Sequence, residues 1–149
     1  MSIWLIGAGH MAQEYAKVLH KLDIKFEVIG RGKKSADSFE SVTSHIVRQG
    51  GLSIALQDSS PPDQAIISVA VEDLYGVAIQ LVKSGVKRIL IEKPGGLNKK
   101  EIKELNTAAK LHNSEILVAY NRRFHKSTEI LKKLVIKDGG ATSCSFEFT

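Results

Sequence analysis

Short apolar runs separated by helix-length amphipathic segments most constrain what this chain can fold into. The runs lie at residues 2–6, 24–30, 64–70, 87–91 and 114–120, with a weaker one at 45–47. Continuous apolar runs are typical of strands buried on both faces, and an intervening helix allows the next strand to run parallel. We therefore predict an α/β fold with a doubly wound parallel sheet.

The segments between these runs carry apolar residues at helical spacing. The first predicted helix begins at Met11, and its predicted buried face consists of Met11, Tyr15, Val18, Leu19 and Leu22. Further helices are predicted at residues 35–41, 74–82, 98–111 and 124–137, with a turn of helix after Gly51. Asn98 and Glu101 have the spacing of a capping box, and the alternating stretch at 141–149 predicts a last strand.

The sequence GAGHMA, residues 7–12, follows the first apolar run and fits the pattern G-x-G-x-x-A. Gly7 permits a tight turn, Gly9 leaves room for a pyrophosphate, and Ala12 lets the helix pack closely. Backbone N–H groups and the helix dipole at such a turn attract phosphate. The predicted pyrophosphate-binding residues of this Rossmann-type turn are Gly7, Ala8, Gly9, His10, Met11 and Ala12.

The end of the second run predicts which dinucleotide binds. An acidic residue there usually receives the ribose 2′-hydroxyl of NAD, whereas basic residues accommodate the 2′-phosphate of NADP. Here Gly30 is followed by Arg31 and Lys33, and Glu27 lies about three residues too early. We therefore predict that Arg31 and Lys33 bind NADP, with NAD as the alternative cofactor. A solvated basic turn is the other interpretation of this stretch.

The fifth run ends in Glu92, Lys93 and Pro94. Beside the first turn, this tip would lie near the nicotinamide end of a dinucleotide. The Lys93 ammonium could then hydrogen-bond a substrate hydroxyl and stabilise alkoxide charge, while Pro94 fixes the bend. The sixth run ends in YNRRF, residues 120–124, a second cationic tip. A surface turn and a solvated helix start are the competing structural interpretations of these two motifs.

GAGHMA, EKP at 92–94 and YNRRF, in that order, resemble the Gfo/Idh/MocA oxidoreductase family, which includes glucose-fructose oxidoreductase and inositol dehydrogenase. The resemblance spans the chain but only the N-terminal half of a typical member. It implies an NAD(P)-binding Rossmann domain at 1–121, and at 122–149 the linking helix and first strand of a C-terminal substrate domain that the chain lacks. The chain is then either a piece of a longer protein or a natural short relative.

The resemblance also assigns roles to residues. Lys93 would be the catalytic lysine that touches the sugar hydroxyl, Glu92 and Pro94 would lie by the cofactor, and the Lys93–Pro94 bond is often cis in relatives. Arg122 and Arg123 match an arginine-rich element near the active site. The predicted substrate-binding residues are Lys93, Asn121, Arg122 and Arg123.

Two departures from the family pattern concern the cofactor loop and the acid/base residue. Relatives carry a Thr-Pro pair and then a histidine after the fourth strand, whereas this chain has Val69, Ala70 and Tyr75 there. Ala70 is still a predicted cofactor contact. The usual acid/base histidine belongs to the second domain, and no histidine of this chain is an obvious substitute.

The expected function is hydride transfer between a nicotinamide cofactor and a sugar, nucleotide sugar or cyclitol, with the isolated chain inactive without the second domain. A dinucleotide-sensing Rossmann module without redox chemistry is the alternative. Nucleic-acid binding is disfavoured, because the net charge of +5 is spread over several helices and aromatic residues make up only 6% of the chain.

Targeting and metal signals are also lacking in the sequence. No apolar run approaches the roughly 20 residues that cross a bilayer, and the opening MSIWLIGAG lacks a basic n-region. No histidine spacing predicts a metal site. We therefore expect a cytoplasmic protein with a sugar-like partner, no metal, no membrane and no nucleic acid, which forms a homo-oligomer when full-length.

Overall fold

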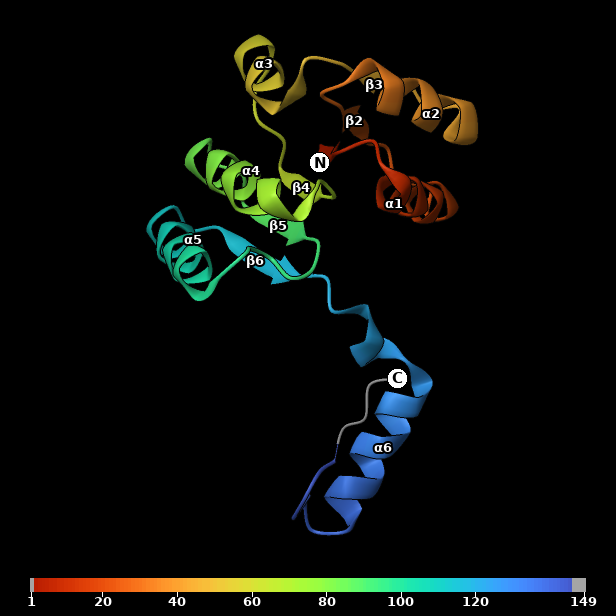
Figure 1. Ribbon diagram of the computed structural model, residues 1–149, viewed down its shortest axis with the longest axis vertical. Coiled ribbons are helices and arrows are strands. Elements are labelled where there is room, and N and C mark those ends of the chain that lie inside the picture. The colour runs from red at the N-terminus through yellow and green to blue at the C-terminus, as the bar shows by residue number, and fades with distance from the viewer. Residues whose placement is uncertain (1, 146–149) are drawn as a thin grey trace. The chain divides into compact units, whose positions relative to one another are not determined.

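The computed structural model describes residues 2–145, and its described strands form one six-stranded, all-parallel sheet (Figure 1). The strands are β1 (Ile3–Ile6), β2 (Glu27–Ile29), β3 (Val47–Arg48), β4 (Gln64–Ile67), β5 (Arg88–Ile91) and β6 (Glu115–Val118). Their order is β3-β2-β1-β4-β5-β6. This arrangement confirms the predicted doubly wound α/β fold, and the strand order reverses between β1 and β4.

The chain divides between Ala119 and Tyr120 into two compact units. The first unit holds the sheet and the helices α1 (His10–Lys21), α2 (Lys33–Thr43), α3 (Gly51–Asp58), α4 (Val71–Lys83) and α5 (Lys99–Leu111). The second unit holds a 3₁₀ helix, η1 (Asn121–Phe124), and the helix α6 (Lys126–Lys137).

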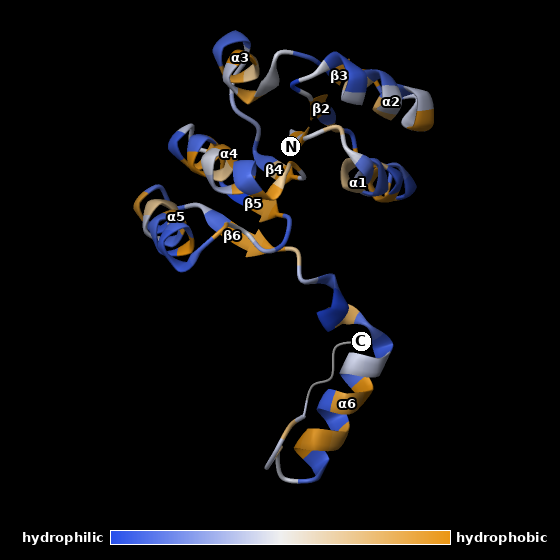
Figure 2. Ribbon diagram, viewed as in Figure 1, coloured by the Kyte–Doolittle hydropathy of each residue, from blue (hydrophilic) through white to orange (hydrophobic). Residues whose placement is uncertain are grey.

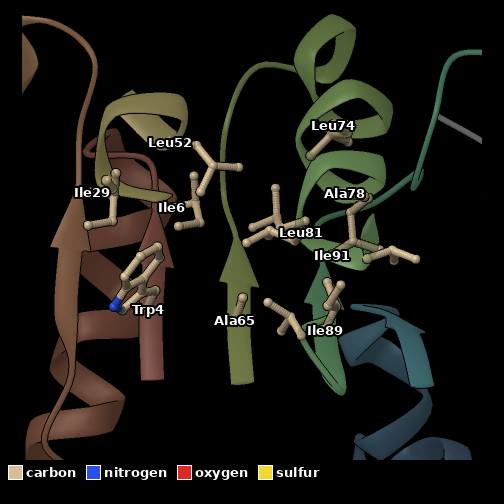
Figure 3. Close-up of a cluster of buried hydrophobic side chains, with 14 of the residues drawn as sticks. Trp4, Ile6, Ile29, Leu52, Ala65, Leu74, Ala78, Leu81, Ile89 and Ile91 are labelled. Carbon is tan, nitrogen blue, oxygen red and sulfur yellow. The ribbon is translucent and has the colours of Figure 1, made fainter. Parts of the chain in front are cut away.

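Alternating side chains of the strands fill two cores, one on each face of the sheet. Ile3 and Leu5 of β1 pack on the face covered by α1 and α2, whereas Trp4 and Ile6 pack on the face covered by α3, α4 and α5. Figure 3 shows the second core, with Leu52, Leu74 and Leu81 of the helices lying over the strand side chains. In Figure 2, β5 and β6 have the hydrophobic colour and α1 is largely hydrophilic. Burial on both faces makes the sheet a rigid base for the loops at its carboxyl edge.

The buried face of α1 differs from the prediction. Met11, Val18 and Leu22, predicted to be buried, have exposed fractions of 45%, 54% and 61%. Leu19 is buried as predicted, and the other buried residues of the helix are Ala12 and Ala16. Two alanines one helical turn apart let α1 approach the strands closely, which large apolar side chains at those positions would prevent. Of the predicted face, Leu19 is therefore buried, Tyr15 is half-buried, and Met11, Val18 and Leu22 are exposed.

The N-terminus of α5 matches the predicted capping box. The side-chain oxygen of Asn98 accepts hydrogen bonds of 3.0 Å from the backbone N–H groups of both Lys100 and Glu101. The Glu101 carboxylate reaches back and accepts a 2.7 Å hydrogen bond from the backbone N–H of Leu97. The bonds from Lys100 and Glu101 satisfy N–H groups that the helix itself leaves without a partner, and the bond from Leu97 fixes the residue before the cap.

Several element boundaries differ from the predicted ones. The second strand begins at Glu27 instead of residue 24, and the fourth ends at Ile67 instead of residue 70. The turn of helix predicted after Gly51 is a full helix, α3. The earlier end of β4 lengthens the loop at the carboxyl edge, where polar groups and turns are accommodated more easily than inside the sheet, whereas the later start of β2 lies at the amino edge.

In the second unit, the predicted helix at 124–137 begins two residues later, at Lys126, after the 3₁₀ turn of η1. It ends before Gly139, whose φ of +86° suits glycine. Residues 141–145 of the strand predicted at 141–149 are not strand, and residues 146–149 lie outside the described residues. Among residues 2–145, none of the helices combines the length and apolar character needed to span a bilayer.

Candidate functional site

A pocket of about 870 Å³ lies at the carboxyl ends of β1, β2, β4 and β5. In a doubly wound sheet, ligands bind at this edge and at the point where the strand order reverses. The predicted site residues that line the pocket are Gly7, Ala8, Gly9, His10, Met11, Arg31, Ala70, Glu92 and Lys93. The first turn and the tip of β5 are therefore brought together, as the sequence motifs required.

Three predicted cofactor residues are not among the lining residues of the pocket. Ala12 is fully buried in the packing of α1 against the sheet. Lys33 is the first residue of α2, and Pro94 follows Lys93 in the turn after β5; both are exposed. Ala12 supports the turn by close packing, as its place in the motif requires.

Gly7 has a conformation and surroundings that no other residue can share. Its φ is +114°, and a Cβ atom built on it would lie 2.1 Å from the backbone oxygen of Ser68. Its N–H donates a 2.9 Å hydrogen bond to the carbonyl of Ile29 in β2. The turn is therefore held against both neighbouring strands, and glycine is required for the fold itself.

Gly9 differs from Gly7, because the fold would tolerate a side chain at Gly9 but that side chain would enter the pocket. Its φ of −85° is accessible to any residue, and a Cβ atom built on it meets no heavy atom within 4 Å. Gly9 is the N-cap of α1, where no side chain caps the helix. The first N–H groups of α1 thus remain open beside the empty space, which is the arrangement that binds a pyrophosphate.

The tip of β2 carries no acidic side chain, and its residue Gly30 is crowded by β3. A Cβ atom on Gly30 would lie 2.6 Å from the Cγ1 atom of Val47 in β3. The Arg31 guanidinium, at the next position, makes a 3.2 Å ion pair with the carboxylate of Asp73 in α4. Asp73 also lines the pocket, a position that the sequence alone does not indicate because nothing in the chain order links the β2 tip to the start of α4.

The start of α2 adds further polar groups near Arg31. Its N-cap, Gly32, has no side-chain cap, and the Ser35 hydroxyl donates a 2.9 Å hydrogen bond to the Gly32 carbonyl. Gly32 and Ser35 both line the pocket. The positive end of the α2 dipole therefore lies on the same side of the pocket as Arg31.

Tyr15 of α1 and Glu92 at the tip of β5 are joined by a hydrogen bond of 2.6 Å from the phenol to the carboxylate. Burial, and then the bond to Glu92, raise the pKa of the Tyr15 phenol. The backbone N–H of Glu92 also donates a 2.9 Å hydrogen bond to the Ile67 carbonyl of β4. From the sequence, Tyr15 is predicted only as part of an apolar face, since helical spacing gives no information about the partner of a phenol.

Lys93 lines the same pocket and is exposed. Its ammonium has no hydrogen bond or ion pair with any of the residues that the structure describes. The Lys93–Pro94 peptide bond is cis, as the family resemblance implies, and the Gly95 N–H closes the turn with a 2.9 Å bond to the Glu92 carbonyl. An unpaired ammonium at the rim of a pocket is free to donate hydrogen bonds to a ligand oxygen.

The predicted substrate residues Asn121, Arg122 and Arg123 form η1 of the second unit, where all three are exposed. The Arg123 guanidinium lies 5.4 Å from the centre of the Phe124 ring. The Thr128 hydroxyl donates a 3.0 Å hydrogen bond to the Arg122 carbonyl, which ties η1 to α6. These contacts give η1 a defined local structure. Among the described residues, no group of three or more His, Cys, Asp or Glu could hold a metal ion.

A glycine turn before α1, an open helix N-terminus and a pocket at the reversal of strand order define the class of Rossmann dinucleotide-binding domains. The chain belongs to the Gfo/Idh/MocA oxidoreductases: the family model described as "Oxidoreductase family, NAD-binding Rossmann fold" matches residues 1–120. Residues 1–120 therefore form an NAD-binding Rossmann domain of this family. No curated protein sequence matched the chain.

Solved structures share this fold. The UDP-N-acetylglucosamine 3-dehydrogenase of Acidithiobacillus ferrooxidans is 21% identical, with a TM-score of 0.74, over 90% of this chain and 41% of that one. The WlbA dehydrogenase of Bordetella pertussis, in complex with NADH and UDP-GlcNAcA, is 17% identical, with a TM-score of 0.80, over 93% and 43%. A putative myo-inositol dehydrogenase of Sinorhizobium meliloti is 20% identical, with a TM-score of 0.76, over 93% and 41%. The chain spans about two fifths of each of these proteins.

Proposed function

We propose that this domain holds NADP, or alternatively NAD, for hydride transfer to or from a carbinol carbon of a sugar, nucleotide sugar or cyclitol. The observation that carries the proposal is that the turn at Gly7–Gly9 and the free ammonium of Lys93 line one pocket. A site with a phosphate cradle at one end and a cationic hydrogen-bond donor at the other suits a dinucleotide with its substrate. Relatives of this fold that act on nucleotide sugars and, by description, on inositol support the substrate class.

The pyrophosphate would lie on the N-terminus of α1. The open space above Gly9 and the uncapped first turn of the helix are the features that fit it. Ala8, His10 and Met11 complete the wall of the cradle, and Ala12 holds the helix close to the sheet. This placement directs the positive end of the helix dipole at the two phosphates.

The nicotinamide end would lie between Ala70 and the tip of β5, with Glu92, Lys93 and Pro94 beside it. When bound, a nicotinamide cofactor supplies a carbon that donates or accepts hydride. The role proposed for Lys93 is to donate a hydrogen bond to the reacting oxygen of the substrate. Its positive charge would stabilise the alkoxide that develops as the carbinol is oxidised.

The preference for NADP rests on the tip of β2. Gly30 leaves no carboxylate at this tip, while Arg31, Lys33 and the start of α2 offer positive charge for a 2′-phosphate. Arg31→Asp should abolish a preference for NADPH over NADH in a titration of the chain. An unchanged ratio of the two dissociation constants in this variant would contradict the assignment.

The complete reaction would need groups beyond this cofactor domain. We propose residues 1–121 as the cofactor domain and 122–149 as the start of a substrate domain that supplies the acid/base residue. On the family resemblance, Asn121, Arg122 and Arg123 are proposed to contact the substrate. We also propose that the full-length protein is a cytoplasmic homo-oligomer.

Thermal unfolding of the 149-residue chain with and without dinucleotide tests the proposed function. At about 100 times the dissociation constant, a ligand adds roughly 2.7 kcal/mol of stability, which corresponds to an increase in Tm of several degrees. We expect this shift with NADPH and NADH, and negligible change in nicotinamide absorbance when sugars are added. No shift at millimolar dinucleotide would refute the binding, and rapid turnover would show that the chain holds a complete active site.

A further inference from the structure

The Arg31–Asp73 ion pair joins two walls of the dinucleotide pocket. Arg31 follows β2, where a dinucleotide places its adenosine ribose, and Asp73 lies in the first turn of α4. The two side chains line the same pocket, with a guanidinium-to-carboxylate distance of 3.2 Å. Their exposed fractions are 81% and 35%, so a ligand could reach both groups.

Asp73 supplies a carboxylate that the tip of β2 lacks. The residue at this tip is Gly30, where a Cβ atom would lie 2.6 Å from the Cγ1 atom of Val47, so an acid there would require the Val47 side chain to shift. The first turn of α4 contains two acids, Glu72 and Asp73, but only Asp73 lines the pocket. A carboxylate near the ribose can accept hydrogen bonds from its hydroxyls, and it repels a 2′-phosphate.

We propose that Asp73 is a specificity-determining residue that limits the preference of the pocket for NADP over NAD. The inference rests on the proposed binding of a dinucleotide. A 2′-phosphate must compete with the Asp73 carboxylate for the Arg31 guanidinium, and it lies within range of the carboxylate charge. NAD lacks this phosphate, so the ion pair can persist while the ribose hydroxyls face a carboxylate acceptor. Arg31 therefore favours NADP, and Asp73 opposes that preference.

Dissociation constants for NADPH and NADH, measured by fluorescence titration of the chain, test this role. Asp73→Asn keeps the shape of the side chain and removes its charge. We expect it to raise the NADPH preference by about fivefold, the factor for one unit-charge interaction at ion-pair distance in water. Glu72→Gln is the matched control, because it removes a charge from the same helical turn outside the pocket lining. It should change the preference by less than about twofold.

Measuring the effect of Asp73→Asn in a chain that already carries Arg31→Gln shows whether Asp73 acts through its ion pair with Arg31 or only through its charge. In Arg31→Gln the ion pair is already absent, so adding Asp73→Asn should change the NADPH preference less than it does in the wild-type chain. Binding of both dinucleotides with an unchanged preference in Asp73→Asn would overturn this inference alone, as would an equal effect of Glu72→Gln. Failure of the wild-type chain to bind either dinucleotide would overturn the proposed function and this inference with it.

Discussion

The phenol of Tyr15 donates a hydrogen bond of 2.6 Å to the carboxylate of Glu92, across 77 positions of sequence. Tyr15 belongs to the helix that follows the glycine turn, and Glu92 precedes the pocket lysine, Lys93. The bond therefore connects the phosphate cradle to the lysine tip, the two parts of the pocket on which the proposed function depends. It also limits the rotation of Glu92, because a carboxylate held by a phenol and a fixed backbone has few orientations left.

Tyr15→Phe removes this hydrogen bond and keeps the ring. We expect a loss of about 1 kcal/mol in the free energy of unfolding, at the low end for a bond to a charged group because the side chain is only half-buried. Binding of NADH should weaken, whereas binding of ADP-ribose, which lacks the nicotinamide, should not. Urea unfolding and titration with both ligands measure the two effects. Equal weakening of NADH and ADP-ribose would show that Tyr15 does not act at the nicotinamide end.

Tyr75→Phe is a matched control for this variant. The Tyr75 phenol also donates to a carboxylate, that of Glu104, at 2.7 Å, but the pair links α4 to α5 on the exposed surface. Water replaces a lost partner readily at such a position. We expect no measurable change in either stability or NADH binding. If Tyr75→Phe lost as much stability and NADH affinity as Tyr15→Phe, the effect of Tyr15→Phe would not depend on its position in the pocket.

Tyr15 should also titrate abnormally. Its pKa is raised in the folded chain, first by burial and then by the bond to Glu92, so the neutral phenol is favoured. The resulting stabilisation is fully present below the ordinary tyrosine pKa of about 10 and is lost as the pH rises above it. The tyrosinate absorbance of the wild-type chain minus that of Tyr15→Phe isolates this residue. We expect its midpoint above about 10 in the folded chain, and at the ordinary value in urea. An ordinary midpoint in the folded chain would contradict the contact.

The sequence predicted the features of this fold that depend on local pattern. The doubly wound parallel sheet, the glycine turn and the capping residue of α5 follow from apolar periodicity and from residues close together in the chain. The contacts of Tyr15 with Glu92 and of Arg31 with Asp73 could not be predicted, because each joins a helix of one βα unit to a strand tip of another. The glycine-turn motif predicted the close packing of Ala12, but apolar periodicity did not predict the burial of Ala16, because the periodic pattern is carried by large side chains and close helix packing selects small ones.

The capping residue Asn98 allows a direct test of how α5 begins. Asn98→Ala removes the acceptor of the two N–H groups of Lys100 and Glu101. We expect a loss of about 1 kcal/mol in the free energy of unfolding, and recovery of most of it in Asn98→Asp, which keeps an acceptor oxygen. Urea unfolding measures both. An equal loss in the two variants would show that the side-chain acceptor does not stabilise the helix.

Gly7→Ala should damage the fold itself. The new methyl group would lie 2.1 Å from the Ser68 carbonyl oxygen, a backbone atom, and the residue would keep a φ of +114° that alanine disfavours. Backbone strain at one such residue costs roughly 1–3 kcal/mol, and the steric overlap adds to it. We expect at least about 2 kcal/mol lost in urea unfolding, with dinucleotide binding lost as well. Near wild-type stability would mean that the turn can adopt another conformation.

Gly9→Ala, two residues later, should leave the fold nearly intact and weaken dinucleotide binding. Its φ of −85° suits alanine, and the new methyl group meets no protein atom within 4 Å, so the free energy of unfolding should fall by about 1 kcal/mol or less, mainly through a poorer N-cap. The methyl group would instead occupy the space proposed for the pyrophosphate, and we expect dinucleotide affinity to fall at least about tenfold. Thermal unfolding without and with NADPH measures both quantities. Because this variant stays folded, an unchanged affinity would show that the pyrophosphate does not bind over the α1 N-terminus.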